Sequence, residues 1–291
     1  MKGQTYRGKR AGPQQWNRVA RASCDSATIL LPFKLFCLIW ILTSDVFGAF
    51  EGTEFFRASL AGMDGICPAA MNNPALLPEY PIWASIGQGQ PLGLSWASFR
   101  TASLGGQAGV WRGAAGVWTS GDKLYRETSL SAALSRPFRN QFWAGLSLTY
   151  QQVTIKNVKP RNGDVILDAA FSSPLNDHLR INLWYGGIPL HRDQAYTSLG
   201  RQLFHLAANA RVGDSMHWAV AIEKTPPFPI RQSVEICLLT KTDMRFLIGY
   251  RTTPATPFLG LQLPVKRLSF SVRMHVHSIF GFATAFGLSY K

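Results

Sequence analysis

Charged and imidazole side chains recur at every second residue in the second half of the chain. Residues 268–277 read LSFSVRMHVH, so the basic side chains share one side and the apolar ones the other. Arginine presents a fork of donors that matches a carboxylate, so this side could bind or pass an anion or the carboxylate of an amphiphile. Ion pairing that braces a filled interior, with Asp168 as a further acid, is the alternative. The candidates on this side are His205, Arg211, His217, Glu223, Arg231, Glu235, Arg245, Arg251, Arg273, His275 and His277.

The sequence lacks the patterns of a metal, cofactor or catalytic site. His275 and His277 share one side about 7 Å apart by strand rise, but the segment offers no third ligand, so we predict no metal site. No G-x-S-x-G context marks a serine nucleophile, and the glycine pairs lack the helix and lysine of a phosphate loop. We therefore predict no enzyme and no cofactor. A disulfide between Cys67 and Cys237 is left open.

The segments that carry these residues alternate with a period of two, which is typical of β-strands. Such strands fit a soluble sandwich or barrel with its apolar side inward, or a transmembrane barrel with that side toward lipid. Segment lengths of about 9 to 11 residues, with aromatic residues near the segment ends, favour the transmembrane barrel. We predict an all-β, antiparallel transmembrane barrel of about fourteen strands, or twelve if the two short, glycine-rich first segments are not strands. The segments are 82–87, 92–99, 107–119, 125–138, 141–156, 164–174, 178–188, 202–212, 216–223, 231–240, 244–252, 258–265, 268–277 and 282–291.

The connections between these segments differ in length. Arg139-Asn140 and Asn176-Asp177 are predicted to be tight turns. The connections at 157–163, 189–201 and 224–230 are longer and are predicted to lie on the extracellular side, because transmembrane barrels have short turns at one end and long loops at the other.

The first 48 residues have the order of a secretory signal peptide. Seven basic residues up to Lys34 precede the apolar run LFCLIWIL at residues 35–42, which is too short to span a bilayer. We predict cleavage after Gly48, which leaves 23 basic and 14 acidic residues, a net charge of +9. No run of clustered Lys or Arg follows, so nucleic acid is not a predicted partner. The predicted organisation is a signal peptide at 1–48, a plug segment at 49–81 and a barrel at 82–291.

The segment before the first strand carries a recognisable order of residues. Arg57-Ala58, Gly62 and then Asn73-Pro74-Ala75-Leu76-Leu77 resemble the R-A, glycine, N-P-A-x-L opening of FadL-type and PorV-type outer-membrane barrels. In those families the opening precedes a fourteen-stranded barrel and lies partly in the lumen. The resemblance implies that Arg57, Gly62, Asn73 and Pro74 are plug or ligand-gate residues.

Two further segments resemble the PorV-type family. Residues 130–150 are similar to its strand, basic turn and strand, and residues 277–291 are similar to its closing hairpin. Residues 66–70 stand where an acidic pair is common, and the chain ends in Tyr290-Lys291 where a terminal Phe is usual. The mature length is also short for a FadL-type transporter.

This resemblance implies a non-catalytic, porin-like protein in the outer membrane of a Gram-negative envelope, in contact with outer-membrane lipid. Its function would be passage of a hydrophobic or amphiphilic small molecule, or service as a membrane partner in protein export and surface display. The first predicts a continuous or gated cavity beside residues 57–77. The second predicts a filled lumen and a loop surface at 189–201 or 224–230 that docks another protein, such as a secretion-system protein. The alternatives are a soluble periplasmic structural β protein and an outer-membrane lipid hydrolase, whose catalytic geometry a sequence does not display.

Overall fold

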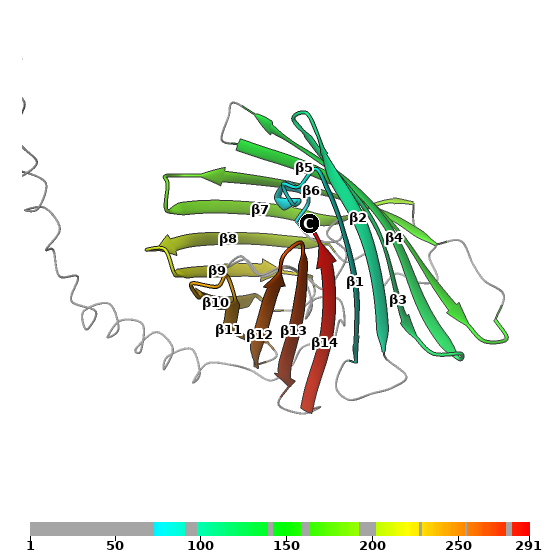
Figure 1. Cartoon of the computed structure of the whole chain (residues 1–291). Helices are drawn as coiled ribbons and strands as arrows, with labels where there is room; N and C mark the ends of the chain where they lie inside the picture. The colour runs from blue at the N-terminus through cyan, green and yellow to red at the C-terminus, as the bar shows by residue number, and fades with distance from the viewer. Residues whose placement is uncertain are drawn as a thin grey trace, which may run out of the picture. The chain divides into compact units, whose positions relative to one another are not determined.

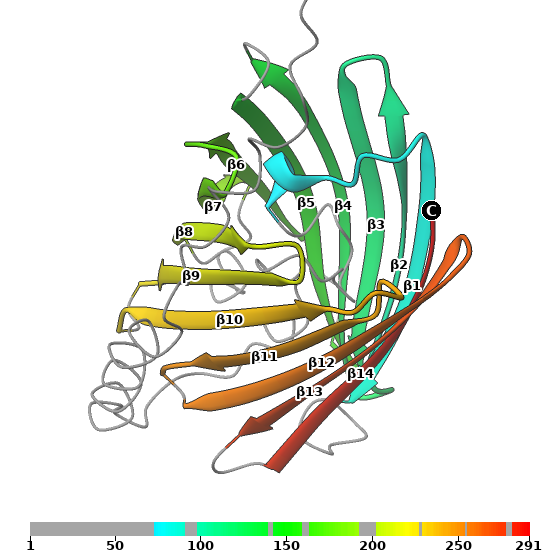
Figure 2. The same ribbon diagram turned by 60° about the vertical axis from the view of Figure 1, so that its left-hand side comes forward.

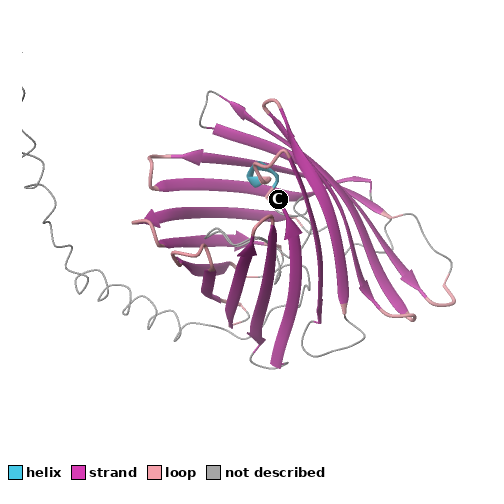
Figure 3. Ribbon diagram, viewed as in Figure 1, coloured by secondary structure: helices cyan, strands magenta, loops and turns pink. Residues whose placement is uncertain are grey.

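Alternating short segments pair in sequence order to form a single antiparallel sheet (Figure 1, Figure 3). The computed structural model describes residues 73–90, 98–138, 142–158, 163–191, 202–226, 229–253, 255–277 and 281–291. The predicted signal peptide, Arg57 and Gly62 lie outside these residues. The fourteen strands are β1 (Ile82–Gln90), β2 (Phe99–Ala108), β3 (Trp111–Gly121), β4 (Tyr125–Phe138), β5 (Phe142–Ile155), β6 (Asp164–Pro174), β7 (Leu179–His191), β8 (Leu203–Val212), β9 (Met216–Lys224), β10 (Arg231–Leu239), β11 (Arg245–Arg251), β12 (Thr256–Val265), β13 (Leu268–His277) and β14 (Gly281–Tyr290).

The sheet closes on itself because its first and last strands pair. β1 and β14 are antiparallel, and their register runs from Ala84 opposite Tyr290 to Gln90 opposite Thr284. Closure leaves no unpaired strand edge, which is a condition for strands that face lipid. The predicted fold, an all-β antiparallel barrel of fourteen strands, is therefore confirmed. The described residues contain no helix long and apolar enough to cross a bilayer.

Exposure alternates along the strands with apolar side chains outward. In β4, Leu130 and Leu134 are exposed, whereas Ser131 and Ser135 are buried; in β8, Phe204 is exposed. A soluble barrel would bury the apolar side chains and expose the serines. The observed order is that of a barrel whose outer surface faces lipid.

The third predicted segment is wrong in position, and most of the second lies outside the described residues. Segment 92–99 falls mostly on residues 91–97, outside the described residues, and the next strand is β2 at Phe99–Ala108. A turn at Gly109 and Val110 interrupts the predicted segment 107–119, so β3 begins at Trp111. Glycine-rich sequence hides the alternation here, because Gly105 and Gly106 lie inside β2 and pair with Ala114 and Gly113. The other twelve segments match strands to within three residues at each end.

The two ends of the barrel differ in their connections. At the end where β1 begins and β14 finishes, six connections have two to five residues each; we call this the short-turn end. At the opposite, long-loop end the connections reach eleven residues, between β7 and β8. The predicted turn at 176–177 lies at the short-turn end, whereas the turn predicted at 139–140 lies outside the described residues. The described parts of the three predicted long connections adjoin strand ends at the long-loop end. β7 continues through His191, so residues 189–191 belong to a strand and not to the predicted loop.

Three inward aromatic rings lie flat on glycines of neighbouring strands. Phe99 covers Gly89, Trp83 covers Gly105 and Phe258 covers Gly249, each so closely that an added methyl group would overlap the ring. A ring can lie against the wall only where the wall has no side chain of its own. These glycines therefore serve packing and not backbone flexibility.

Gly249→Ala and Gly89→Ala are expected to destabilise the barrel by about 1 to 3 kcal/mol each, the usual cost of overpacking. Gly113→Ala is the matched control, because its nearest neighbour would be Leu134 Cδ2 at 3.5 Å, an ordinary contact. The measurement is the urea midpoint of each protein in lipid vesicles, followed by tryptophan fluorescence. Equal midpoints for Gly249→Ala and Gly113→Ala would contradict the packing role of Gly249.

The connection between β3 and β4 is held by the Asp122 carboxylate. Its Oδ1 accepts hydrogen bonds from the backbone N–H groups of Tyr125 at 3.0 Å and Leu124 at 2.7 Å. These hydrogen bonds, that of Tyr125 first, lower the pKa of Asp122 below its ordinary value. A carboxyl whose pKa is depressed by folding stabilises the fold above its unfolded pKa and loses that contribution as pH falls through the folded value.

Asp122→Ala is therefore expected to lower the urea midpoint at pH 7, and the difference from wild type should shrink as pH falls below about 4. Midpoints measured between pH 7 and pH 2 test this. Lys123→Ala serves as the control in the same turn. A difference between wild type and Asp122→Ala that does not change with pH would show that the carboxylate charge has no part in holding the turn.

Candidate functional site

Residues 73–77 form a tight turn that we call the N-terminal turn. Pro74–Leu76 is a single 3₁₀ turn, and the Asn73 Oδ1 atom accepts a hydrogen bond from Ala75 N at 2.9 Å. Asparagine suits this capping position, and proline suits the next one because its missing N–H would have no partner there. Asn73, Pro74, Ala75 and Leu77 are buried. Local sequence chemistry thus accounts for the conformation of the N-P-A motif.

The N-terminal turn is buried because it packs on the inner wall of the barrel. It contacts β4, β5 and β6, and in Figure 2 it leads into the start of β1. Gly145 of β5 lies directly beneath it, and an added methyl group there would overlap the Pro74 carbonyl. Leu77 belongs to a buried apolar cluster with Trp83, Ala114 and Ala133. Ala75 belongs to a second cluster with Ala170, Trp184 and Leu203.

One arginine anchors the chain on both sides of Pro78. Arg112, at the start of β3, forms an ion pair with Glu79 and donates from Nη1 to the Leu77 carbonyl at 3.3 Å. Its guanidinium carbon lies 3.3 Å from the ring centroid of Trp143. The Arg112 side chain is 7% exposed and that of Glu79 is 65% exposed. Stacking on the Trp143 ring therefore orients the buried Arg112 guanidinium toward the residues that precede β1.

Arg112 is a site residue that was not predicted from the sequence. Its position next to Trp111 in an alternating strand places it on the inner side, and this parity was the available signal. The glycines and alanines at 113–116 obscured the alternation. Arg57 and Gly62 lie outside the described residues, so of the four predicted plug residues only Asn73 and Pro74 can be placed.

The predicted inner-side residues occupy three kinds of position. The structure buries His205, Glu235, Arg273 and His275, half-buries His217, Glu223, Arg231, Arg245 and Arg251, and leaves Arg211 exposed. The side chain of His277 is not among those described. Arg211 lies at the short-turn end of β8, where it pairs with Asp214 at 2.8 Å. Whether these residues line a path for a ligand stays a prediction.

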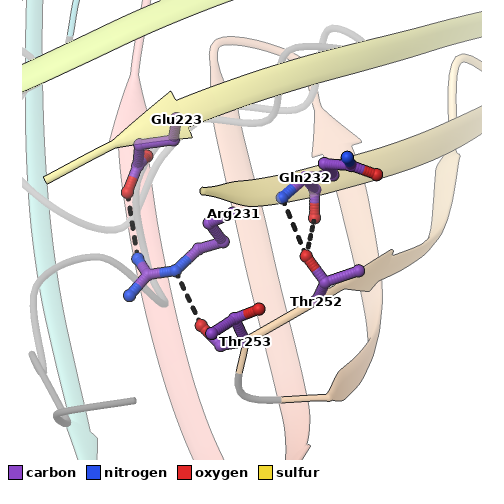
Figure 4. A network of polar contacts seen from close by, with 5 residues as sticks. All are labelled: Glu223, Arg231, Gln232, Thr252 and Thr253. Carbon is purple, nitrogen blue, oxygen red and sulfur yellow. Dashed lines mark hydrogen bonds and ion pairs between the residues drawn. The ribbon is translucent and has the colours of Figure 1, made fainter. Parts of the chain in front are cut away.

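Glu223 and Arg231 form an ion pair at the long-loop end (Figure 4). Arg231 Nη1 lies 2.9 Å from Glu223 Oε1, and its Nε donates to the Thr253 carbonyl at 3.0 Å. Gln232 N donates to Thr252 Oγ1 at 2.8 Å beside it. This network ties the end of β11 to the start of β10 and the end of β9, so these two predicted candidates have a bracing role in the structure.

Two adjacent rows of inward side chains cross β10 to β13. In one row Glu235 lies opposite Gly249, Gly249 opposite Phe258 and Phe258 opposite His275. The His275 and Phe258 rings stack with centroids 5.1 Å apart. In the next row Cys237 lies opposite Leu247, and Arg273 follows beyond Gly260. The wall here sets charged and imidazole groups beside an apolar cluster made of Ala219, Cys237, Leu247 and Phe258.

Asp168 holds an irregularity in the wall. The register of β6 with β7 shifts between Leu167 and Ala169, where Asp168 is buried. Its carboxylate accepts hydrogen bonds from Gly187 N at 2.8 Å and from Ser147 Oγ at 3.1 Å. Gly187 has a φ of +78°, which favours glycine. Asp168 therefore stabilises a bulge, in addition to any balance of charge with the arginines.

Cys237 is a buried free thiol, and Cys67 lies outside the described residues. No three metal-ligating side chains gather anywhere in the described part of the chain.

Solved structures with the same architecture are outer-membrane proteins. The TodX deltaS2S3 mutant, a monoaromatic hydrocarbon channel, matches with a TM-score of 0.53 and 9% identity, over 78% of this chain and 95% of that one. The toluene transporter TodX of P. putida matches with a TM-score of 0.52 and 10% identity, over 76% and 91%. Omp33 of Acinetobacter baumannii matches with a TM-score of 0.51 and 7% identity, over 73% and 98%. The fold is that of an outer-membrane β-barrel. No protein-family model and no curated protein sequence matches the chain.

Arg112→Ala is expected to release the N-terminal turn, because it removes an ion pair, a hydrogen bond and a stacking contact together. The reporter is maleimide labelling of Ala75→Cys in a background with Cys67→Ser and Cys237→Ala. Labelling should speed up about tenfold or more, as expected for loss of a charged hydrogen bond worth roughly 1.5 to 3 kcal/mol. Arg126→Ala is the control, because Arg126 lies at the long-loop end of β4, far along the wall from the N-terminal turn. Equal labelling rates in the two variants would contradict the anchoring role of Arg112.

Proposed function

We propose that this protein is a non-catalytic channel of the outer membrane that passes small apolar or amphiphilic molecules. The observation that supports this most directly is the N-terminal turn, which packs on the inner wall of a closed barrel and is fixed there by one arginine. A segment bound inside a barrel can regulate what passes through it. In this proposal residues 1–48 are a cleaved signal peptide, and residues 49–81, with Arg57, Gly62, Asn73 and Pro74, are the plug.

The inner wall has the chemistry that an amphiphile requires. The apolar cluster around Phe258 lies beside Glu235, Arg273 and His275, so one small molecule could contact both kinds of surface. Two of the similar structures are described as a toluene transporter and a monoaromatic hydrocarbon channel. We infer that the long-loop end faces outward and the short-turn end faces the periplasm, as in barrels of this class.

Cells that display the protein in their outer membrane are expected to take up the apolar dye N-phenylnaphthylamine several-fold faster than cells without it. Arg112→Ala should raise the rate further, because the turn no longer holds its docked position, and Arg126→Ala should not. The measurement is the dye's fluorescence rise after addition to intact cells.

A shift in gel migration on boiling verifies that each variant has formed a closed barrel. Barrels that show this shift but admit dye no faster than empty cells would rule out the channel. The role as a partner in protein export would then be the remaining candidate, to be tested on the connections at 189–201 and 224–230.

A further inference from the structure

Arg136 faces outward from the wall, on the side of the exposed leucines. It shares the outward side of β4 with Leu130 and Leu134, two residues before the strand ends at the short-turn end. Its guanidinium carbon lies 5.0 Å from the ring centroid of Trp111 and 5.2 Å from that of Phe138. Both rings are exposed on the same side. Within the described residues, no carboxylate is within ion-pairing distance of Arg136.

The position of Arg136 along the strand fits the level of the lipid head groups. A charge on the lipid-facing side is costly at the middle of the bilayer and much less so near its surface, where aromatic residues gather. Such a group lies beside Arg136: Trp111, Phe138 and the tilted ring pair Phe142 and Phe171, with centroids 5.6 Å apart.

Other cations at the short-turn end also pair with aromatic side chains. Arg267 donates from Nη1 to the Tyr290 hydroxyl at 3.1 Å, and Lys291 Nζ lies 5.2 Å from the ring centroid of Tyr80. These residues belong to the turn between β12 and β13 and to the two chain segments beside β1 and β14. Cations beside rings therefore recur around this rim, which is the pattern of a membrane interface.

We propose that Arg136, Trp111 and Phe138 form a binding site for the head group of an anionic phospholipid in the leaflet at the short-turn end. The guanidinium fork would bind the phosphate oxygens, and the two rings would flank the glycerol and the first methylenes of the acyl chains. Charge complementarity supports this occupant, since the site supplies a cation that has no acidic partner in the described part of the chain. The proposal rests on the membrane orientation given above, but not on the passage of any substrate.

The test is native mass spectrometry of the barrel, released from nonionic micelles that contain equal amounts of phosphatidylglycerol and phosphatidylcholine with matched acyl chains. Arg136→Gln should reduce the ratio of bound phosphatidylglycerol to phosphatidylcholine about fivefold, the factor expected for one interfacial cation. Arg126→Gln, an outward arginine at the other end of the same strand, should leave the ratio unchanged. An unchanged ratio in Arg136→Gln would overturn the proposal.

A second readout places the lipid next to Trp111. Phosphatidylglycerol brominated on its acyl chains should quench more fluorescence in wild type than in Trp111→Phe, and brominated phosphatidylcholine should show a smaller difference. Equal differences for the two lipids would overturn the proposal. So would competition by millimolar inorganic phosphate, which indicates a free-anion site, or a preference for lipid A, which indicates the other leaflet. Failure of dye uptake leaves these outcomes unaffected, so the two proposals fail separately.

Discussion

Backbone hydrogen bonding is the constraint on which the rest of this structure depends. Lipid offers no partner for an N–H or a C=O group, so the sheet has to close, and it closes where β1 meets β14. The inner side of this seam is lined by small residues, with Ser85 opposite Ser289, Gly87 opposite Gly287 and Gly89 opposite Ala285. Once the sheet is closed, each strand has one side toward lipid and one toward the interior. The separation of leucine and phenylalanine from serine and threonine follows from that division.

Bulky inward side chains then have to fit against the wall without breaking it. Aromatic rings meet this need by lying flat, and each requires a glycine on the next strand, as Phe99 requires Gly89 and Phe258 requires Gly249. Gly145 allows the same close approach by backbone atoms, because the Pro74 carbonyl of the N-terminal turn occupies the place of a side chain there. Buried charges have a parallel requirement, because an inward charge needs a partner or a ring. Arg112 has both, in Glu79 and Trp143.

Strand number and most strand limits could be predicted because a lipid-facing wall imposes strict alternation, which is visible wherever large and small side chains alternate. The prediction failed at β2 and β3, where glycine and alanine occupy both sides and only three-dimensional packing, such as Trp83 over Gly105, distinguishes them. Alternation also predicted correctly that Glu235, Arg273 and His275 lie on the inner side of their strands. Their partners could not be predicted, because a pair such as Arg231 and Glu223 depends on register between strands. Arg112 was missed because glycine and alanine at 113–116 obscure the alternation, and its partners Glu79 and Trp143 lie 33 and 31 residues away in sequence.

The two ends of the barrel carry different groups of inward side chains. Phe258 and His275 lie close to the long-loop ends of β12 and β13, whereas Arg112 lies at the short-turn end of β3. In the proposed orientation a molecule arriving from outside meets the mixed polar and apolar wall first and the docked turn afterwards. Such an order would separate recognition from release in the proposed channel. In that proposal the wall residues would determine which molecule is held, and the two contacts of Arg112 with Leu77 and Glu79 would determine when the short-turn end opens. Glu79 is exposed while Arg112 is buried, so solvent reaches the ion pair from the Glu79 side.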